Sequence, residues 1–229
     1  MKPMMNKIAR RLSIGILVVF MPIFLLSSVT EYYTFSNKYY MKQFEKYEIS
    51  EHTGIENNDL EKITAKLTGY LKDTEDNLII YAPVNGDEEQ IFQSREIFHM
   101  VDVKDLFLLL EKLKLISLFL CLVIGMYFIF RRRFKSLFYG MLGAGIGYTV
   151  FLVSLGSMML IDFSKYFTKF HELFFTNDLW LLDPDTDILI QMLPQGFFVD
   201  IAVAIIVTTA VLIYGVGAIT WVVSRGYDD

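Results

Sequence analysis

The chain has 229 residues, and 54% of them are hydrophobic, a fraction too high for an ordinary soluble domain and typical of an integral membrane protein. Its formal net charge of −5 excludes little, because the charged residues are segregated along the chain. The single cysteine, Cys121, lies in an apolar run, which excludes an intramolecular disulfide and a cysteine-based zinc site. The sequence has no nucleic-acid-binding motif.

Four long apolar stretches predict membrane-spanning helices, because a helix needs about 20 residues to cross the hydrocarbon core. The first stretch lacks an Ala-x-Ala site, which favours a retained span over a cleaved signal peptide. In the third, Gly140, Gly143, Ala144 and Gly147 predict close helix packing. In chain order we expect transmembrane helix 1 over 1–29, an extracytoplasmic cap over 30–105, transmembrane helix 2 over 106–133, transmembrane helix 3 over 137–161, an extracytoplasmic aromatic-rich segment over 162–196 and transmembrane helix 4 over 197–223.

Basic residues predict the orientation, since cytoplasmic loops carry an excess of Lys and Arg. They precede the first span and fill the link between the second and third: Lys2, Lys7, Arg10, Arg11, Arg131, Arg132, Arg133 and Lys135. We therefore expect a multi-pass protein of the cell membrane with both termini in the cytoplasm. No predicted span carries an acidic or basic residue at its centre, which argues against an ion-coupled transporter or a proton pump.

The first outer segment is patterned as a small folded cap. Apolar residues recur at helical spacing after a capping-box-like Asn58-x-x-Glu61, which predicts an amphipathic helix ending near Leu71. The turn dipeptide Asn85-Gly86 predicts a hairpin, with strands at Leu78–Tyr81 and at Ile91-Phe92. The predicted fold class is a mainly α membrane protein with four transmembrane helices and a small extracytoplasmic α+β cap.

Two of the three histidines, His99 and His171, lie in outer segments close to a span, where an imidazole can handle protons near neutral pH. Asp102, with an acidic residue three positions on, predicts the start of the helix that contains the second span. His99 would then lie just before a helix N-terminus, whose positive potential should keep its imidazole neutral. His52 lies in a polar stretch, and we expect no chemical role for it.

The second outer segment is rich in aromatic residues, and His171 borders an aromatic face formed by Phe163, Phe167, Phe170 and Phe174. The simplest interpretation of this face is an interfacial membrane anchor; the alternative is an apolar-walled pocket for a lipid-like ligand. The sequence contains no His-Glu-x-x-His zinc motif, no Gly-x-Ser-x-Gly nucleophile motif and no glycine-rich phosphate loop. On these residues alone, the simpler interpretation of either histidine is an interfacial residue without chemical function, and the alternative is a catalytic role.

Two long motifs resemble those of the bacterial lipoprotein intramolecular transacylases. They are Glu96-x-x-His99-Met100-x-Asp102-Val103-Lys104 and His171-Glu172-x-x-Phe175-x-Asn177-x-x-Trp180-x-x-Asp183-Pro184. The resemblance extends over essentially the whole chain, including the four-span layout. It implies an acyltransferase that moves the sn-2 acyl chain of a diacylglyceryl-modified N-terminal cysteine onto the α-amino group of that cysteine, which yields the lyso-form lipoprotein. The positions that match the family's catalytic histidines are His99 and His171.

Amine and ester belong to one substrate, so their orientation in the site can supply part of the rate enhancement. Two imidazoles can then serve as base and acid for the proton transfer. We expect His99 to be the base and His171 the acid, with no cofactor and no metal. The expected partners are diacylglyceryl-modified lipoproteins and membrane lipid. Expected substrate-binding residues are Arg95, Glu96, Asp102, Phe170, Phe174, Phe175, Asn177, Trp180 and Asp183. Two alternatives stay open: a non-enzymatic envelope sensor or chaperone with a lipid- or protein-binding cap, and a metal-dependent lipid hydrolase.

Overall fold

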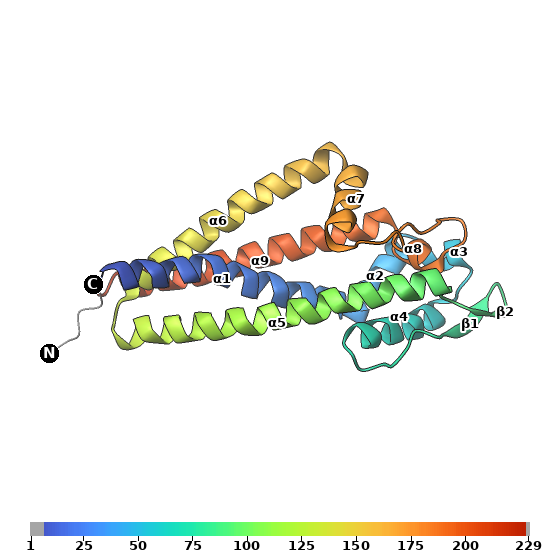
Figure 1. Ribbon diagram of the computed structural model, residues 1–229, viewed down its shortest axis with the longest axis horizontal. Coiled ribbons are helices and arrows are strands. Elements are labelled where there is room, and N and C mark those ends of the chain that lie inside the picture. The colour runs from blue at the N-terminus through green and yellow to red at the C-terminus, as the bar shows by residue number, and fades with distance from the viewer. Residues whose placement is uncertain (1–6, 228–229) are drawn as a thin grey trace. The chain divides into compact units, whose positions relative to one another are not determined.

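The computed structural model describes residues 7–227, without the side chain of Met159; the first six residues of the predicted first span, including Lys2, lie outside this range. Figure 1 labels the elements along the chain. They are α1 (Lys7–Thr34), α2 (Asn37–Lys46), α3 (Ile49–Thr53), α4 (Asn57–Leu71), β1 (Tyr81–Val84), β2 (Asp87–Gln90), α5 (Ser94–Phe130), α6 (Phe134–Ile161), α7 (Phe163–Phe174), α8 (Ile188–Met192) and α9 (Gln195–Ser224).

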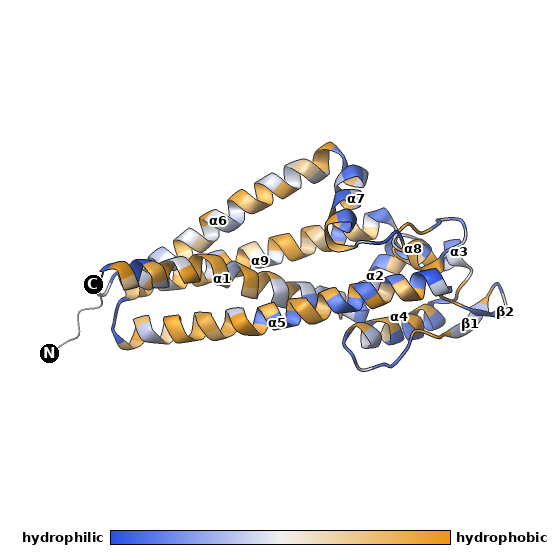
Figure 2. Cartoon of the chain, viewed as in Figure 1, coloured by the Kyte–Doolittle hydropathy of each residue, from blue (hydrophilic) through white to orange (hydrophobic). Residues whose placement is uncertain are grey.

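Four of the described helices are long and apolar enough to cross a membrane: Lys7–Thr34, Ser94–Phe130, Phe134–Met158 and Gln195–Ser224. With the two-stranded sheet formed by β1 and β2, they confirm the predicted fold class. Helix α5 has 37 residues, almost twice the number that a span requires. Its first turns mix charged and apolar residues, and its later turns are mostly hydrophobic (Figure 2). The helix is therefore longer than a single crossing needs, and its charged residues gather in its first turns.

The chain divides into two compact units, one of which contains most of the apolar helices: residues up to Thr30, Leu110–Phe163 and 205 onward. Its core consists of Leu17, Cys121, Ile124, Phe128, Met141 and Ala144. A Cβ atom added at Gly140 would lie 3.0 Å from Leu17, and one at Gly143 would lie 2.7 Å from Val18. The predicted close packing is thus confirmed at these two glycines. It is wrong at Gly147, where an added Cβ would meet no described atom within 4 Å.

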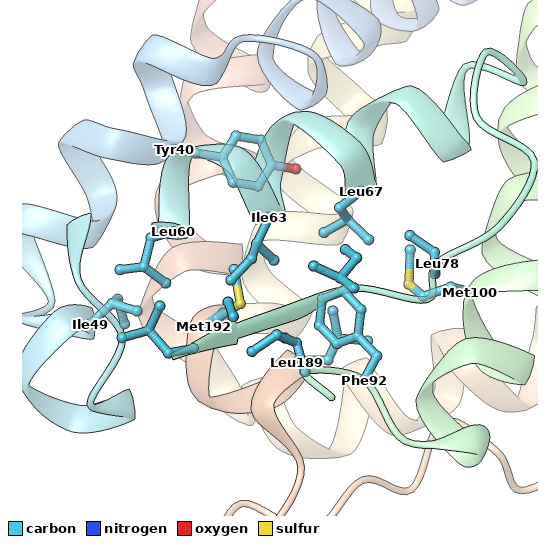
Figure 3. Close-up of a cluster of buried hydrophobic side chains, with 14 of the residues drawn as sticks. Tyr40, Ile49, Leu60, Ile63, Leu67, Leu78, Phe92, Met100, Leu189 and Met192 are labelled. Carbon is cyan, nitrogen blue, oxygen red and sulfur yellow. The ribbon is translucent and has the colours of Figure 1, made fainter. Parts of the chain in front are cut away.

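The second unit comprises Glu31–Leu109 and Ser164–Ala204. Helix α4 ends at Leu71, as its apolar spacing predicts, and contributes Leu60, Ile63 and Leu67 to a core in which all three are at most 1% exposed. Figure 3 shows these side chains directed toward Leu78, Phe92 and Met100, and toward Leu189 and Met192 of α8. Burial of these apolar side chains is the main force that holds the unit together, since the described part has no disulfide.

The predicted hairpin turn is confirmed, but the strands lie closer to it than predicted. The antiparallel strands β1 and β2 pair Val84 with Asp87 across Asn85-Gly86. The predicted strand residues Leu78 and Ile91 are instead 0% and 1% exposed and pack in the core. The paired residues of β2 are polar, and three of the four are exposed. The apolar residues that suggested strands mark contacts with the core instead.

A glycine supports the hairpin from the segment after α3. Gly54 has φ +68°, its carbonyl accepts a hydrogen bond of 2.9 Å from the N–H of Asn85, and a Cβ added there would lie 2.4 Å from Asn85 Oδ1. Gly86 has φ +96°, but its added Cβ would meet no described atom within 4 Å. We expect Gly54→Ala to lower the free energy of unfolding by about 1 kcal/mol more than Gly86→Ala, because only the first combines strain with a clash. Thermal unfolding in detergent would measure this difference, and equal losses would contradict it.

Candidate active site

The site begins with the N-terminus of α5, which lies eight residues before the predicted start at Asp102. The predicted start is therefore wrong, and Glu96 explains why the helix begins at Ser94. Its Oε2 accepts a hydrogen bond of 2.7 Å from the N–H of Gln93, which is the carboxylate half of a capping box. Its Oε1 accepts a second bond of 2.7 Å from the N–H of Leu189 in α8. Glu96 is 0% exposed, and burial raises its pKa although the two hydrogen bonds oppose this shift.

His99 lies within α5, in its second turn, and not in the turn before a helix. The helix-terminus explanation for a neutral imidazole is therefore wrong, and a different cause takes its place. His99 is 8% exposed, and its burial, together with the nearby His171, lowers its pKa to about 4. Within residues 7–227, its buried Nδ1 has no hydrogen-bond partner. The neutral ring thus offers an unused polar atom inside the protein.

His171 lies near the end of α7 and is 7% exposed. Its Nδ1 is 2.8 Å from the carbonyl oxygen of Phe167, one helical turn earlier. A carbonyl can only accept, so Nδ1 carries the hydrogen and Nε2 of the neutral ring is unprotonated. Burial lowers the pKa of His171, while the hydrogen bond to Phe167 opposes this change. In the neutral imidazole of His171, the main chain thus selects the tautomer with the hydrogen on Nδ1.

The two histidines, 72 positions apart in sequence, face each other. Their ring centres are 6.1 Å apart with an interplanar angle of 38°. Phe175, itself only 8% exposed, contacts both rings at centroid distances of 5.4 Å to His99 and 5.6 Å to His171. The indole of Trp180 stacks on His171 at 4.8 Å and 30°. The pair thus lies in an aromatic environment that keeps water away from both rings.

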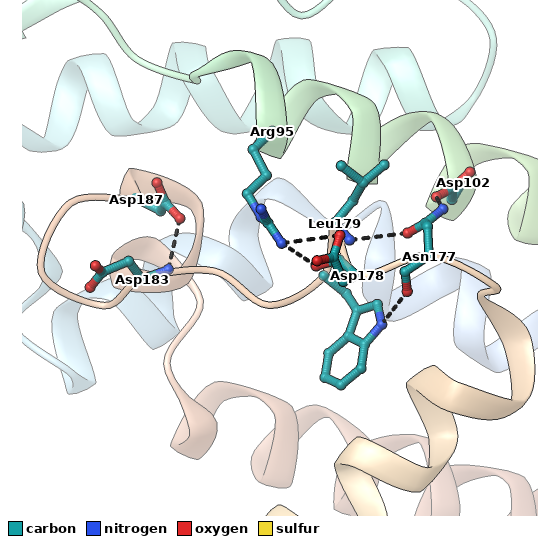
Figure 4. Close-up of polar contacts among 8 residues, drawn as sticks. Arg95, Asp102, Asn177, Asp178, Leu179, Asp183 and Asp187 are labelled. Atoms are coloured by element: carbon teal, nitrogen blue, oxygen red, sulfur yellow. Dashed lines mark hydrogen bonds and ion pairs between the residues drawn. The ribbon is translucent and has the colours of Figure 1, made fainter.

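Most of the predicted polar site residues hold the loop after α7 to the first turns of α5 (Figure 4). Asn177 Nδ2 donates a hydrogen bond of 2.8 Å to Asp102 Oδ2. Arg95 Nη2 donates to the carbonyl oxygen of Asp178 and lies 3.4 Å from its carboxylate. Asp183 lies in the turn before α8, where its Oδ1 accepts a hydrogen bond from the N–H of Asp185. The structure therefore brings Asp102 and Asn177 together one turn from His99.

The remaining aromatic residues differ in their distance from the pair. Phe170 lies edge-on to His171 at 5.4 Å, and Phe174 packs against Phe170 at 4.8 Å; both are 48% exposed. Phe167 was predicted to lie on the aromatic face but not in the site. Its ring lies 4.4 Å from that of His171, and its carbonyl fixes the tautomer. The four-residue spacing between the two positions was the signal for this contact.

In the part of the chain that the structure describes, no three His, Cys, Asp or Glu side chains are grouped so that they could hold a metal ion. The site residues offer instead two imidazoles, an aromatic lining and a few polar side chains, a set suited to proton transfer on an apolar substrate.

The four long apolar helices define an integral membrane protein, and the family that it matches is one of acyltransferases. A family model described as "Lipoprotein intramolecular transacylase Lit" matches residues 15–198, and the chain belongs to this family. A comparison with curated proteins found no match.

Solved structures of one family member have the same fold. The lipoprotein intramolecular transacylase Lit from Bacillus cereus is 21% identical, with a TM-score of 0.82 over 97% of this chain and 100% of that chain. A variant of that enzyme with a histidine replaced by arginine is 21% identical, with a TM-score of 0.75 over 94% of this chain and 93% of the other. A second variant, with a histidine replaced by alanine, is 22% identical, with a TM-score of 0.75 over 95% of this chain and 96% of the other.

Proposed function

We propose that this protein moves the sn-2 acyl chain of a diacylglyceryl-modified lipoprotein onto the α-amino group of its N-terminal cysteine, at the outer face of the cell membrane. The observation that carries the proposal is the pair of buried imidazoles of His99 and His171, 6.1 Å apart, in a chain of the transacylase family. This spacing lets one ester group contact both rings. The basic residues before the first span and between the second and third favour an outer location for the pair.

The reaction forms a C–N bond, breaks the C–O bond at the sn-2 position and transfers one proton from the amine to the glycerol oxygen. His171 suits the role of base, because its Nδ1 donates to Phe167 and its Nε2 lone pair is free to take the amine proton. The resulting imidazolium then gives this proton to the departing glycerol oxygen. This assignment reverses the expectation from sequence, which rested on a helix terminus next to His99.

His99 suits a different role. Its pKa of about 4 makes it a weak base, and it stays neutral throughout the physiological range. A neutral imidazole can donate a hydrogen bond to the oxygen that becomes negative as the amine attacks, and such a donor is strong where water is excluded. Two positive charges so close together would repel each other, so at most one of the two imidazoles is protonated to imidazolium at a time.

The aromatic lining suits the acyl chain. Phe170 and Phe174 are half exposed, so they offer apolar surface beside the pair, and Phe175 contacts both imidazoles. Exclusion of water by these rings favours attack by the amine over hydrolysis of the ester. Because donor and acceptor belong to one molecule, their alignment supplies several kcal/mol without a second substrate.

A crossover experiment tests this function. Purified protein in detergent receives two diacylated lipopeptides that differ in peptide mass, one of which carries deuterated acyl chains. We expect N-acylated lyso-form products of unchanged total mass, each with its own chains, because the transfer is intramolecular. Mass spectrometry distinguishes the outcomes: mixed products would contradict intramolecular transfer, free fatty acid would indicate a hydrolase, and unchanged lipopeptides would indicate a sensor or chaperone.

A further inference from the structure

Three polar groups of Asn177 form hydrogen bonds within the protein. Its side-chain Nδ2 donates to Asp102 Oδ2 at 2.8 Å, and its Oδ1 accepts from the N–H of Leu179 at 3.1 Å. Its backbone carbonyl accepts from Nε1 of Trp180 at 2.9 Å. Asn177 therefore connects a carboxylate of α5 to the indole of Trp180.

That indole is the one that stacks on His171. The ring centres of Trp180 and His171 are 4.8 Å apart, and the planes are 30° from parallel. The face of an indole carries negative potential and attracts a cation, so it stabilises imidazolium more than neutral imidazole. Asp102, at the other end of the connection, lies three residues after His99 on the same helix.

We infer that Asn177 is a positioning residue, which links Asp102 to Trp180 and so holds the indole face where it orients the His171 imidazole opposite His99 and stabilises its protonated form. The inference rests on the proposed function, in which His171 carries a proton between amine and glycerol oxygen. It differs from a substrate-binding role for Asn177, because it places the effect on the proton-transfer step. Loss of the link should therefore lower kcat and leave KM unchanged.

An exchange of the two linked side chains tests the inference. Asn177→Asp brings two carboxylates face to face and removes the donor, while its carboxylate can still accept from Leu179. Adding Asp102→Asn restores one donor and one acceptor with reversed polarity. We expect the single variant to lower kcat by about tenfold at unchanged KM, and the double variant to recover most of the loss. A double variant as slow as the single, or a change confined to KM, would overturn the inference.

Fluorescence gives a readout that needs no substrate. The chain has two tryptophans, so Trp221→Phe leaves Trp180 as the only reporter. Imidazolium quenches a stacked indole, and the rings in contact with His171 are those of one titratable residue, His99, and of Phe167, Phe170, Phe175 and Trp180. Because the pKa of His171 is lowered, we expect emission to fall with a midpoint below pH 6.5.

The same variants separate the possible causes. His171→Gln should abolish the fall in emission, and His99→Gln should keep it. Asn177→Asp should weaken the fall, and the double variant should restore it. A fall that persists in His171→Gln, or that Asn177→Asp leaves intact, would overturn the inference. Active His99→Gln and His171→Gln enzymes would instead overturn the proposed function, and the fluorescence result would not depend on that outcome.

Discussion

Replacing His99 or His171 with glutamine should lower kcat/KM for lyso-form lipoprotein production by about 10²–10⁴-fold, the usual contribution of a positioned acid or base. Glutamine retains much of the volume and polarity of histidine, but it cannot take up a proton at neutral pH. The His171 variant loses the acceptor of the amine proton. The His99 variant exchanges the ring N–H for an amide N–H at a different position, so the donor toward the developing oxyanion is misplaced. Mass spectrometry of the N-terminus of a diacylated lipopeptide measures both losses.

His52→Gln is the matched control, because His52 is exposed in α3 and should leave the rate unchanged. Thermal unfolding of all three variants in detergent separates loss of chemistry from loss of structure. If both buried-histidine variants still produced N-acylated product at the rate of the unmodified chain, the catalytic assignment would be wrong.

The largest effect on stability is expected for Glu96→Ala. This change leaves the buried N–H of Leu189 and the part-buried N–H of Gln93 without their acceptor, and two lost charge-assisted bonds with one stranded buried donor cost about 3 kcal/mol. Glu96→Gln should cost less, since an amide oxygen can still accept one of the two bonds. Glu89→Ala, on the exposed strand β2, should cost little. Thermal unfolding in detergent ranks the three variants, and equal losses would contradict the proposed role of the carboxylate.

The pH dependence of this stability has a definite sign. Burial raises the pKa of Glu96 above 4.5, so above that pH the folded state holds more protons at this residue than the unfolded state. Its contribution to the free energy of unfolding therefore falls as the pH rises from 4.5 through the raised pKa. Comparison of Glu96→Gln with the unmodified chain at several pH values isolates this slope.

The sequence predicted the elements whose signal is local. The four apolar stretches are long helices, α4 ends at Leu71, and the turn at Asn85-Gly86 joins two strands. These features depend on hydrophobic length, helical periodicity and turn chemistry, all of which can be read from neighbouring residues. The strand bounds were wrong because the apolar residues Leu78 and Ile91 pack in the core and not in the ladder.

The site was predictable only in part, because its geometry depends on contacts between residues far apart in the chain. The motifs indicated His99 and His171. The predicted start of α5 was eight residues too late, because Asp102 has the features of an N-cap although the helix begins at Ser94. The residue that extends the helix is Glu96, whose second partner, Leu189, lies 93 positions away. The tautomer of His171 likewise follows from a main-chain carbonyl whose role becomes visible only once α7 has formed.

Glu96 accepts hydrogen bonds from two backbone segments that are far apart in the chain, the start of α5 and α8, and this couples their local unfolding. If the first turn of α5 unfolds, the carboxylate loses its bond to the Gln93 N–H and keeps only the one to Leu189. If α8 detaches, the carboxylate loses the Leu189 bond and keeps only the one to Gln93. Opening of either piece removes one of the two hydrogen bonds that stabilise this buried carboxylate, so we expect the two amides to exchange as one cooperative unit. The segment that carries one imidazole and the segment that follows the other are in this way protected together.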